Sequence, residues 1–266
     1  MTALQYYIID PTKNITALVE TPVPAASRPF AARKIMEKEP SCEQVGFVFR
    51  NEQGEYCLSM AGGEFCGNAS MSAAALFCWK SVITSAEPRA LRLRVSGAPA
   101  PVAVHVTAKR DGSFACSVRM PEPERITEAV LPLNGKSLSF PLVCFPGISH
   151  IIIARGELNA DEAERVIRDW CGRLSVPGLG IMLFEKTSMF LRPLVYVPGP
   201  DTLFWESSCA SGTAALGAFL ARKEGGVSLS INEPGGVLRV ESTPEGAVAL
   251  SGYVTILEKR QIVVNL

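Results

Sequence analysis

Two segments of this chain share an unusual order of residue types, and they constrain its fold more than any other feature. Residues 64–76 read EFCGNASMSAAAL, and residues 206–221 read ESSCASGTAALGAFLA. Each contains a cysteine, then a turn of small or capping residues, then an Ala-rich stretch typical of a helix. Because small side chains let strands approach a helix closely from several sides, each segment predicts a buried helix with a thiol at its N-terminus.

The surroundings of the two segments also repeat. In each half of the chain a β-rich run leads to the cysteine and another follows the Ala-rich stretch, ending at Ser96-Gly97 in the first half and before Pro234-Gly235-Gly236 in the second. This shared order indicates an internal duplication at low sequence identity. We therefore predict an α+β protein of two pseudo-symmetric domains, each a mixed, mostly antiparallel sheet or barrel around a central helix.

The boundary is predicted near residues 119–121, where the run MPEPER interrupts the strands. Residues 1–118 would form the domain that carries Cys66 and residues 119–266 the domain that carries Cys209, with a return of the last strand to the first domain as an alternative. A third helix is predicted over residues 160–174, because acids come first and bases later, as the helix dipole favours. Runs rich in β-formers and bounded by turn residues predict strands at 4–10, 15–20, 45–50, 56–62, 91–97, 101–108, 149–158, 180–186, 189–197, 227–232, 236–242 and 248–257.

Composition narrows the classes of partner. Lys plus Arg and Asp plus Glu number 26 each, so no basic field favours nucleic acid or an anionic membrane, and a small molecule is the expected partner. The sequence has no apolar run long enough to span a membrane, and MTALQYYIIDPTKN lacks the features of a signal peptide, which predicts a cytoplasmic protein. The eight cysteines include no CxxC pair and the histidines number two, so no metal site is expected.

The chemistry of the two cysteine turns suits proton transfer. Helix N-termini lower thiol pKa values and bind anions. Two such termini brought face to face across a domain cleft would hold a substrate carboxylate on backbone N–H groups, with one sulfur on each side of the adjacent carbon. One thiolate would then remove the α-proton while the opposite thiol delivers another, which is a racemisation.

Taken alone, either cysteine is more simply explained as core packing, and the case rests on the pair. With both turns in view, the chain resembles the cofactor-independent amino-acid racemases of the diaminopimelate epimerase fold. Within that fold it resembles the histidine racemases of staphylopine-type metallophore pathways. The segments that carry the resemblance, in order, are CEQVGF (42–47), EFCGNASMS (64–72), GIMLFE (180–185), PLVYVP (193–198), WESSCASGTA (205–214) and PGG (234–236).

The resemblance implies a role for each matching residue. Cys66 and Cys209 would be the acid/base pair, without pyridoxal phosphate or a metal. The residues that it implies in substrate binding are Asn14, Glu43, Gly67, Asn68, His150, Glu206, Ala210 and Ser211. Of these, Glu206 is otherwise explained as a solvated strand end, and His150 as a half-buried histidine with an ordinary hydrogen-bond partner. The family's usual arrangement also implies a homodimer.

The substrate is predicted from positions at which this sequence departs from the diaminopimelate epimerase pattern. Diaminopimelate epimerases carry an arginine ahead of the second cysteine for the distal carboxylate, whereas residues 197–209 read VPGPDTLFWESSC and contain none. Phe65, Phe204 and Trp205 would offer rings for an imidazole to stack on, with Glu206 beside them. Histidine is therefore the predicted substrate, in L and D forms, with a diaminopimelate epimerase or a racemase of another amino acid as the alternative.

A thiol redox switch that joins Cys66 and Cys209 is the alternative outside racemase chemistry. The absence of CxxC and of a thioredoxin-like βαβ pattern disfavours it. A non-catalytic amino-acid binder is a further alternative, but it would not need a thiol at both turns.

Overall fold

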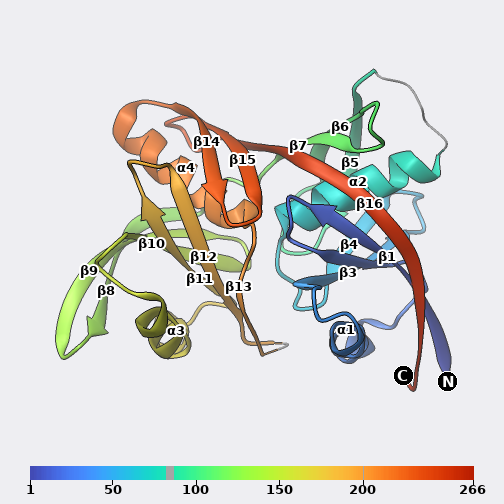
Figure 1. Cartoon of the computed structure of the whole chain (residues 1–266), viewed down its shortest axis with the longest axis horizontal. Helices are drawn as coiled ribbons and strands as arrows, with labels where there is room; N and C mark the ends of the chain where they lie inside the picture. Colours follow the sequence, from blue (N-terminus) through green and yellow to red (C-terminus); the bar gives the residue numbers. More distant parts are fainter. Residues whose placement is uncertain (82–86, 200) are drawn as a thin grey trace. The chain divides into compact units, whose positions relative to one another are not determined.

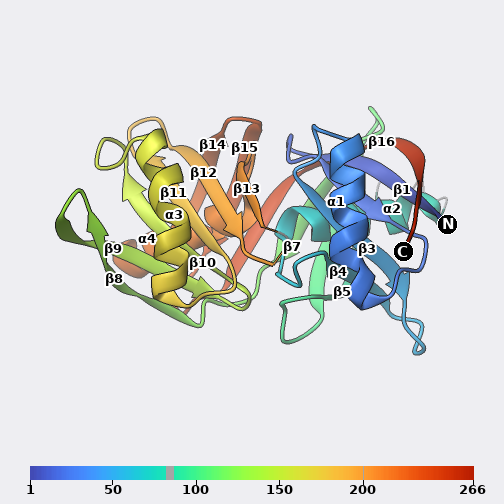
Figure 2. The same cartoon turned by 90° about the horizontal axis from the view of Figure 1, so that it is seen from below.

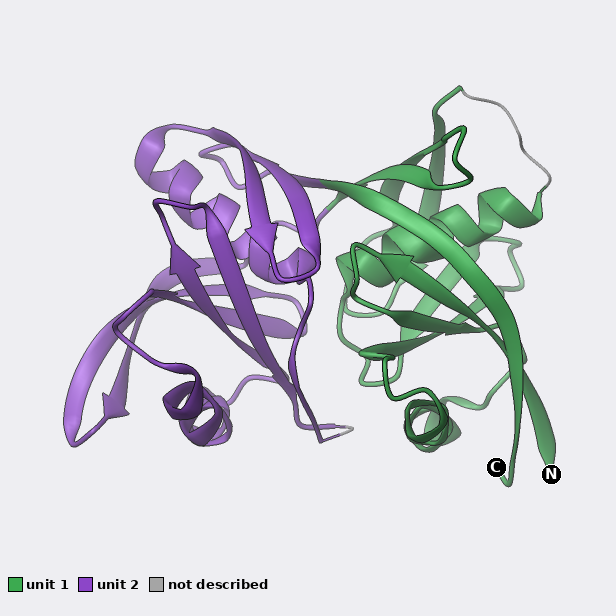
Figure 3. Ribbon diagram, in the orientation of Figure 1, with its two compact units in different colours: residues 1–119, 251–266 green, residues 120–250 purple. Residues whose placement is uncertain are grey.

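The chain forms two compact units in a computed structural model that describes residues 1–81, 87–199 and 201–266. Residues 1–119 together with 251–266 make up unit 1, and residues 120–250 make up unit 2 (Figure 3). Each unit has its own buried core, and each contains one of the two cysteine turns.

Unit 1 is an eight-strand barrel (Figure 1). Its neighbouring strands follow the order β1, β2, β3, β4, β5, β6, β7, β16, and β16 pairs back with β1 to close it. The pairs β2–β3 and β4–β5 are parallel, which requires crossover connections, and helices α1 and α2 supply them. The strands are β1 (Thr2–Pro11), β2 (Thr16–Val19), β3 (Gln44–Arg50), β4 (Tyr56–Met60), β5 (Arg89–Val95), β6 (Val102–Ala108), β7 (Phe114–Arg119) and β16 (Val248–Val264).

The predicted helix after Cys66 is confirmed as α2 (Gly67–Lys80), which forms the centre of unit 1. It packs against β1, β2, β4, β5, β6 and β7, and its Ala73, Ala74 and Ala75 are fully buried. Only small side chains allow that many strands to approach one helix, which is the physical meaning of the Ala-rich sequence.

Helix α1 (Arg28–Lys38) was not predicted from the sequence. It follows a short 3₁₀ turn, Ala25–Ser27, and packs on the outside of the barrel against β3 (Figure 2). It buries only Ala31, Ala32 and Ile35, so its apolar stripe is too narrow to give a clear helical period.

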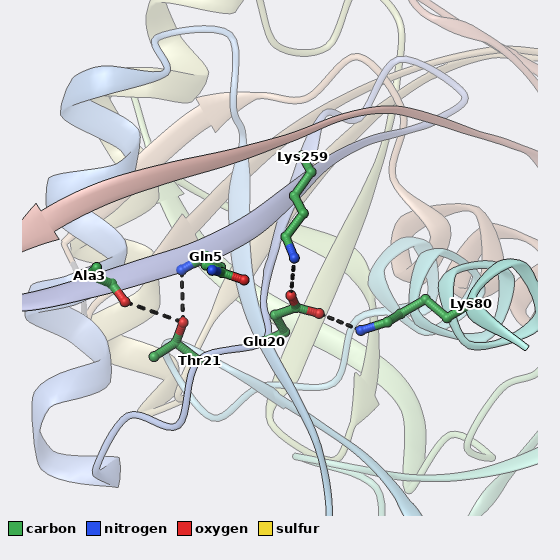
Figure 4. Close-up of polar contacts among 6 residues, drawn as sticks. All are labelled: Ala3, Gln5, Glu20, Thr21, Lys80 and Lys259. Carbon is green, nitrogen blue, oxygen red and sulfur yellow. Dashed lines mark hydrogen bonds and ion pairs between the residues drawn. The ribbon is translucent and has the colours of Figure 1, made fainter.

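Lysines on two elements of unit 1 meet at Glu20, which follows β2. The carboxylate of Glu20 accepts a hydrogen bond from Lys259 Nζ on β16 at 2.6 Å, and another from Lys80 at the end of α2 (Figure 4). Next to it, Thr21 Oγ1 accepts the Gln5 N–H of β1 at 2.8 Å. These contacts tie the closing strand of the barrel to its central helix.

Unit 2 is a mixed sheet in the order β15, β14, β12, β11, β10, β9, β8, with β13 on β12. The pairs β10–β11 and β12–β14 are parallel, and the other pairs with a defined register are antiparallel. Its strands are β8 (Arg125–Leu133), β9 (Lys136–Phe145), β10 (Ile148–Ala154), β11 (Leu179–Glu185), β12 (Phe190–Val197), β13 (Thr202–Trp205), β14 (Val227–Glu233) and β15 (Gly236–Ser242).

Two helices complete unit 2, and both were predicted. Helix α3 (Ala160–Leu174) begins at a capping box in which Asn159 and Glu162 each bond the other's backbone N–H, and it buries Trp170 against the sheet. Helix α4 (Ala210–Glu224) follows Cys209, is buried along most of its length, and packs against β9, β10, β14 and β15. Across the described ranges, none of the helices has the length and apolar character needed to cross a membrane.

Candidate active site

Cys66 is the N-cap residue of α2. Its backbone is extended, with φ −132° and ψ 116°, and its sulfur accepts the Ala69 N–H at 3.3 Å. The chain is held in place before the cysteine by Ser96, whose hydroxyl donates to the Glu64 carbonyl oxygen at 2.9 Å and accepts the Met60 N–H at 2.9 Å. The thiol therefore takes the role that a serine or aspartate side chain normally has at a helix start.

The glycine after Ser96 has a steric reason. Gly97 adopts φ +73°, and a Cβ at this position would lie 2.3 Å from the Phe65 backbone nitrogen. A larger residue would therefore displace the segment that leads into Cys66.

A chain of polar side chains connects Cys66 to two predicted site residues. The Cys66 thiol donates to Gln44 Oε1, with the sulfur and oxygen 2.9 Å apart. Gln44 Nε2 donates to Asn14 Oδ1 and to Thr16 Oγ1, the latter at 2.9 Å, and Asn14 Nδ2 donates to Glu43 Oε2 at 2.7 Å. The fold thus brings Asn14, Glu43 and Cys66 together, and adds Gln44, which the sequence reasoning did not single out.

The other two predicted residues of unit 1 are the first two of α2. Gly67 and Asn68 are buried directly after the cysteine. Backbone N–H groups in the first turn of a helix point toward its N-terminus, so this end can accept an anion. Glu64, two residues before Cys66, is a half-buried carboxyl whose pKa is raised because burial disfavours its charged form.

Cys209 caps α4 in nearly the same way. Its φ of −129° and ψ of 101° are again extended, and its sulfur accepts the Gly212 N–H at 3.3 Å. The Ser211 hydroxyl lies 3.6 Å from the sulfur, and Ala210 and Ser211 begin the helix. A Cβ on Gly212 would lie 3.2 Å from the sulfur and 2.2 Å from Met182 Sδ, so the glycine leaves room for both side chains.

The expected effect of the helix N-terminus on this thiol is wrong for Cys209. Its pKa is raised well above the ordinary value, first by burial, then by the negative charges of Glu206 and Glu233, and by a hydrogen bond to Glu206. The helix end is outweighed because the sulfur is almost fully buried and faces two carboxylates. Glu206, a predicted site residue, is therefore in contact with the cysteine rather than at a solvated strand end.

His150 lies on β10, fully buried, and the nitrogens of its ring have no hydrogen-bond partner among the described residues. Burial lowers its pKa to about 3, so the ring is neutral. A Cβ on Gly180, its register partner in β11, would lie 2.2 Å from His150 Nδ1 and 2.6 Å from the methyl carbon of Met182. Met182 thus packs next to both His150 and the start of α4.

The aromatic residues near the cysteines differ from the sequence expectation. The Trp205 indole N–H donates to Glu164 on α3 at 2.5 Å, and the Arg192 guanidinium lies 4.2 Å from its ring centroid. The ring packs on the core beneath α3, so its indole N–H and part of its surface are engaged within unit 2. Phe65 is buried in unit 1. Phe204, next to Trp205 on β13, points to the opposite face of that strand because successive side chains alternate.

Two functional candidates were missed by sequence reasoning. Gln44 stands within the quoted segment CEQVGF, and Glu233 directly precedes the PGG segment. Their chain positions were visible, but their contacts depend on strand pairing: β3 aligns Gln44 with Thr16 of β2, and the β14–β15 turn carries Glu233 to the start of α4.

Comparisons with known proteins agree with these features. Residues 3–263 match the family described as the histidine racemase CntK N-terminal domain. The chain is 28% identical to a histidine racemase of Staphylococcus aureus over 250 residues, covering 90% of this chain and 88% of that protein. It is 32% identical to a histidine racemase of Fusobacterium nucleatum over 243 residues, covering 88% of each.

Solved structures share the fold. A predicted epimerase from Pseudomonas aeruginosa is similar with a TM-score of 0.71 at 12% identity, over 98% of this chain and all of that one. A hydroxyproline epimerase from Agrobacterium vitis, solved with trans-4-hydroxy-L-proline, is similar with a TM-score of 0.68 at 12% identity, over 98% of this chain and 92% of that one. With the family match over nearly its whole length, this chain belongs to the histidine racemase family.

Proposed function

We propose that this protein is a histidine racemase that uses Cys66 and Cys209 as a cofactor-independent acid/base pair. One observation carries the proposal: each unit has a small-residue helix capped by a cysteine, with the sulfur 3.3 Å from an N–H of the first turn. A two-base racemase needs a proton acceptor on one face of the substrate and a proton donor on the other, and the two exchange roles when the reaction runs in reverse. A thiol/thiolate pair can fill both roles.

Each helix start offers what an amino-acid substrate needs. The N–H groups at Gly67, Asn68, Ala210 and Ser211 are proposed to hold the α-carboxylate, and the positive end of each helix dipole favours the negative charge that develops as the α-proton leaves. Asn14, Glu43 and Glu206 are proposed to receive the α-amino group. The mechanism requires each thiol to reach the α-carbon of the same substrate molecule, one on each face.

The proton transfers balance without any co-reactant. The thiolate takes the α-proton and becomes a thiol, the electron pair of the C–H bond moves into the carboxylate-stabilised carbanion, and the opposite thiol gives its proton to that carbon and becomes the thiolate. The enzyme then holds the opposite protonation pattern, which is the form that processes the other enantiomer.

A duplicated origin of the two units is part of the proposal. It is supported by their pairing order: β2 to β6 run parallel, antiparallel, parallel, antiparallel, and β10, β11, β12, β14 and β15 run in the same order. The crossover helices α1 and α2 in one set correspond to α3 and α4 in the other. Two copies of one element would explain two cysteines in the same cap geometry.

Histidine as substrate is supported by the family and its relatives, and by the absence of arginine from residues 197–209. With Trp205 engaged elsewhere, Glu206, Phe204 and the neutral ring of His150 remain as candidates to recognise the imidazole. A homodimer in the cytoplasm, feeding D-histidine to metallophore synthesis, completes the proposal. Diaminopimelate epimerisation is the competing activity within the fold.

A substrate panel tests the proposal. Purified protein in deuterated buffer is incubated with L-His, L-Lys, L-Arg, L-Ala, L-Glu and meso-diaminopimelate, and α-deuteration and loss of optical rotation are measured for each. Histidine should give the highest kcat/KM. If diaminopimelate or glutamate exceeds histidine, the substrate assignment fails, and if no amino acid exchanges its α-proton, the racemase assignment fails as well. Cys66→Ala protein is the matched control for exchange by contaminants.

A further inference from the structure

The start of α4 is held by a carboxylate from a distant strand. Glu233, the last residue of β14, is 5% exposed. Its Oε2 accepts a hydrogen bond from the Cys209 backbone N–H at 2.5 Å, and its Oε1 accepts one from the Thr213 hydroxyl. One carboxylate therefore bonds both the cap residue of the helix and a residue in its first turn.

The turn that carries Glu233 adds a third contact to the same segment. Residues 233–236 join β14 to β15, and the Gly235 N–H donates to the Ser207 carbonyl oxygen at 2.7 Å. Residues on both sides of Cys209 are thus fixed to this turn. In an ordinary capping box the acid that binds the cap N–H comes from the third residue of the same helix, but that position in α4 is Gly212, whose missing side chain leaves room for Met182 and the sulfur.

A buried carboxylate such as that of Glu233 is costly in free energy, and its charge acts on the Cys209 thiol. A carboxylate removed from water needs strong hydrogen bonds and benefits from the positive end of a helix dipole, and Glu233 has both. Its charge is then held close to the Cys209 sulfur, where Glu206 adds a second charge from the segment before the helix. His150, on the neighbouring β10, is neutral and adds none.

We propose that Glu233 is a positioning residue of the racemase: its carboxylate fixes the backbone of Cys209 at the start of α4, and its negative charge adds to burial and to Glu206 in keeping the Cys209 thiol protonated until a substrate is bound. The catalytic part of this inference rests on the proposed function. The raised pKa of Cys209 agrees with it. A thiol kept protonated in this way is the partner that delivers a proton, and after delivery its thiolate is a strong base for the reverse reaction.

Glu233→Gln tests the charge with little change of shape, because the amide oxygen can still accept the Cys209 N–H and the Thr213 hydroxyl can accept from the amide nitrogen. The thiolate of Cys209 is followed by its ultraviolet absorbance against pH, as the difference between each protein and the same protein with Cys209→Ala. The Glu233→Gln midpoint should fall by about one pH unit, which is about tenfold more thiolate at a pH below both midpoints. The pH profile of kcat/KM should shift in the same direction.

Two further variants separate charge from position. Thr213→Val removes one bond of the clamp but keeps the charge, so it should lower kcat and leave the thiolate midpoint unchanged. Glu241→Gln, at an exposed carboxylate on β15, is the matched control and should change neither. An unchanged midpoint in Glu233→Gln overturns the proposal. A shifted midpoint in a protein that does not racemise histidine would instead keep the electrostatic role of Glu233 and reject the proposed function.

Discussion

Gln44→Leu is the substitution that tests the architecture of the first cysteine turn most directly. The Gln44 side chain connects three partners: it accepts the Cys66 thiol and donates to Asn14 and Thr16. Leucine has a similar size and no polar atoms, so it removes all three bonds at once. We expect both a loss of stability and a loss of activity.

The expected loss of unfolding free energy follows from the buried polar groups that lose their bond to Gln44. Asn14 and Thr16 are buried, and a buried polar group that loses its partner costs about 1–3 kcal/mol. Each keeps one other bond, since the Thr16 hydroxyl donates to the Asn14 carbonyl oxygen at 3.0 Å and the Asn14 amide donates to Glu43. The lower end of the range therefore applies to each, and the free energy of unfolding should fall by roughly 2–3 kcal/mol in total.

Activity should fall further than stability explains. Without its acceptor, the Cys66 thiol loses the contact that directs its S–H toward Gln44, and a displaced reacting group can cost about a hundredfold in rate. Urea unfolding followed by circular dichroism gives the stability, and optical rotation of histidine gives kcat/KM on folded protein. Gln53→Leu, at an exposed turn, is the control. A change in unfolding free energy below about 1 kcal/mol, together with kcat/KM unchanged, would refute the network.

Four other outcomes are expected. Cys66→Ser and Cys209→Ser should each lower kcat by at least about a hundredfold, because an alcohol is a much weaker acid than a thiol, and wild-type rates in either would remove the mechanism. In D₂O, the product enantiomer should gain deuterium before the recovered substrate does, whereas equal early labelling would indicate one base or rapid thiol exchange. Activity should survive EDTA and hydroxylamine, since no step is assigned to a metal or to pyridoxal phosphate. Burial lowers the pKa of His150 to about 3 from 6.5, so as the pH falls the unfolded chain binds a proton at this histidine before the folded chain does. The free energy of unfolding should therefore decrease as pH falls from about 6.5 toward 3, and His150→Leu should flatten its measured dependence on pH over that window.

The sequence was most informative where local chemistry decides structure. The helix at 160–174 was predicted with its observed bounds, because the acids at its start and the bases toward its end lie within the same segment, and the structure adds the Asn159 capping box. The two cysteine helices were equally predictable, since runs of Ala next to a cap residue have few other structures available. The hairpin of β8 and β9 was missed although Asn134-Gly135, with φ of 50° and 77°, is a strong hairpin signal, because residues 125–133 also contain charge and proline.

What the sequence could not supply is contact between segments far apart in the chain. Gln44 and Cys66, or Glu233 and Cys209, meet only once the strands have paired. The same limit explains Trp205, whose position beside Glu206 suggested a ligand contact, while strand alternation directs its ring toward α3. The pKa of the Cys209 thiol was also predicted wrongly, because the carboxylate of Glu233 reaches the thiol only in the folded chain. A helix N-terminus lowers a thiol pKa only if burial and neighbouring charges do not oppose it.

The two thiols share a backbone geometry and differ in the side chains that face them. Cys66 is half-buried, and its thiol donates a hydrogen bond to the neutral amide of Gln44. Cys209 is buried, and the negative charges of Glu206 and Glu233 act on its thiol. The proposed two-thiol mechanism requires one thiolate and one thiol at the same time, so unequal surroundings would favour one of the two protonation patterns. Burial and the carboxylates both oppose a thiolate at Cys209, and we therefore expect the resting enzyme to hold its proton there and to begin catalysis from Cys66. A single round of turnover with each enantiomer checks this: the enantiomer whose α-proton faces Cys66 should react without a lag, and the other should wait for the proton to move.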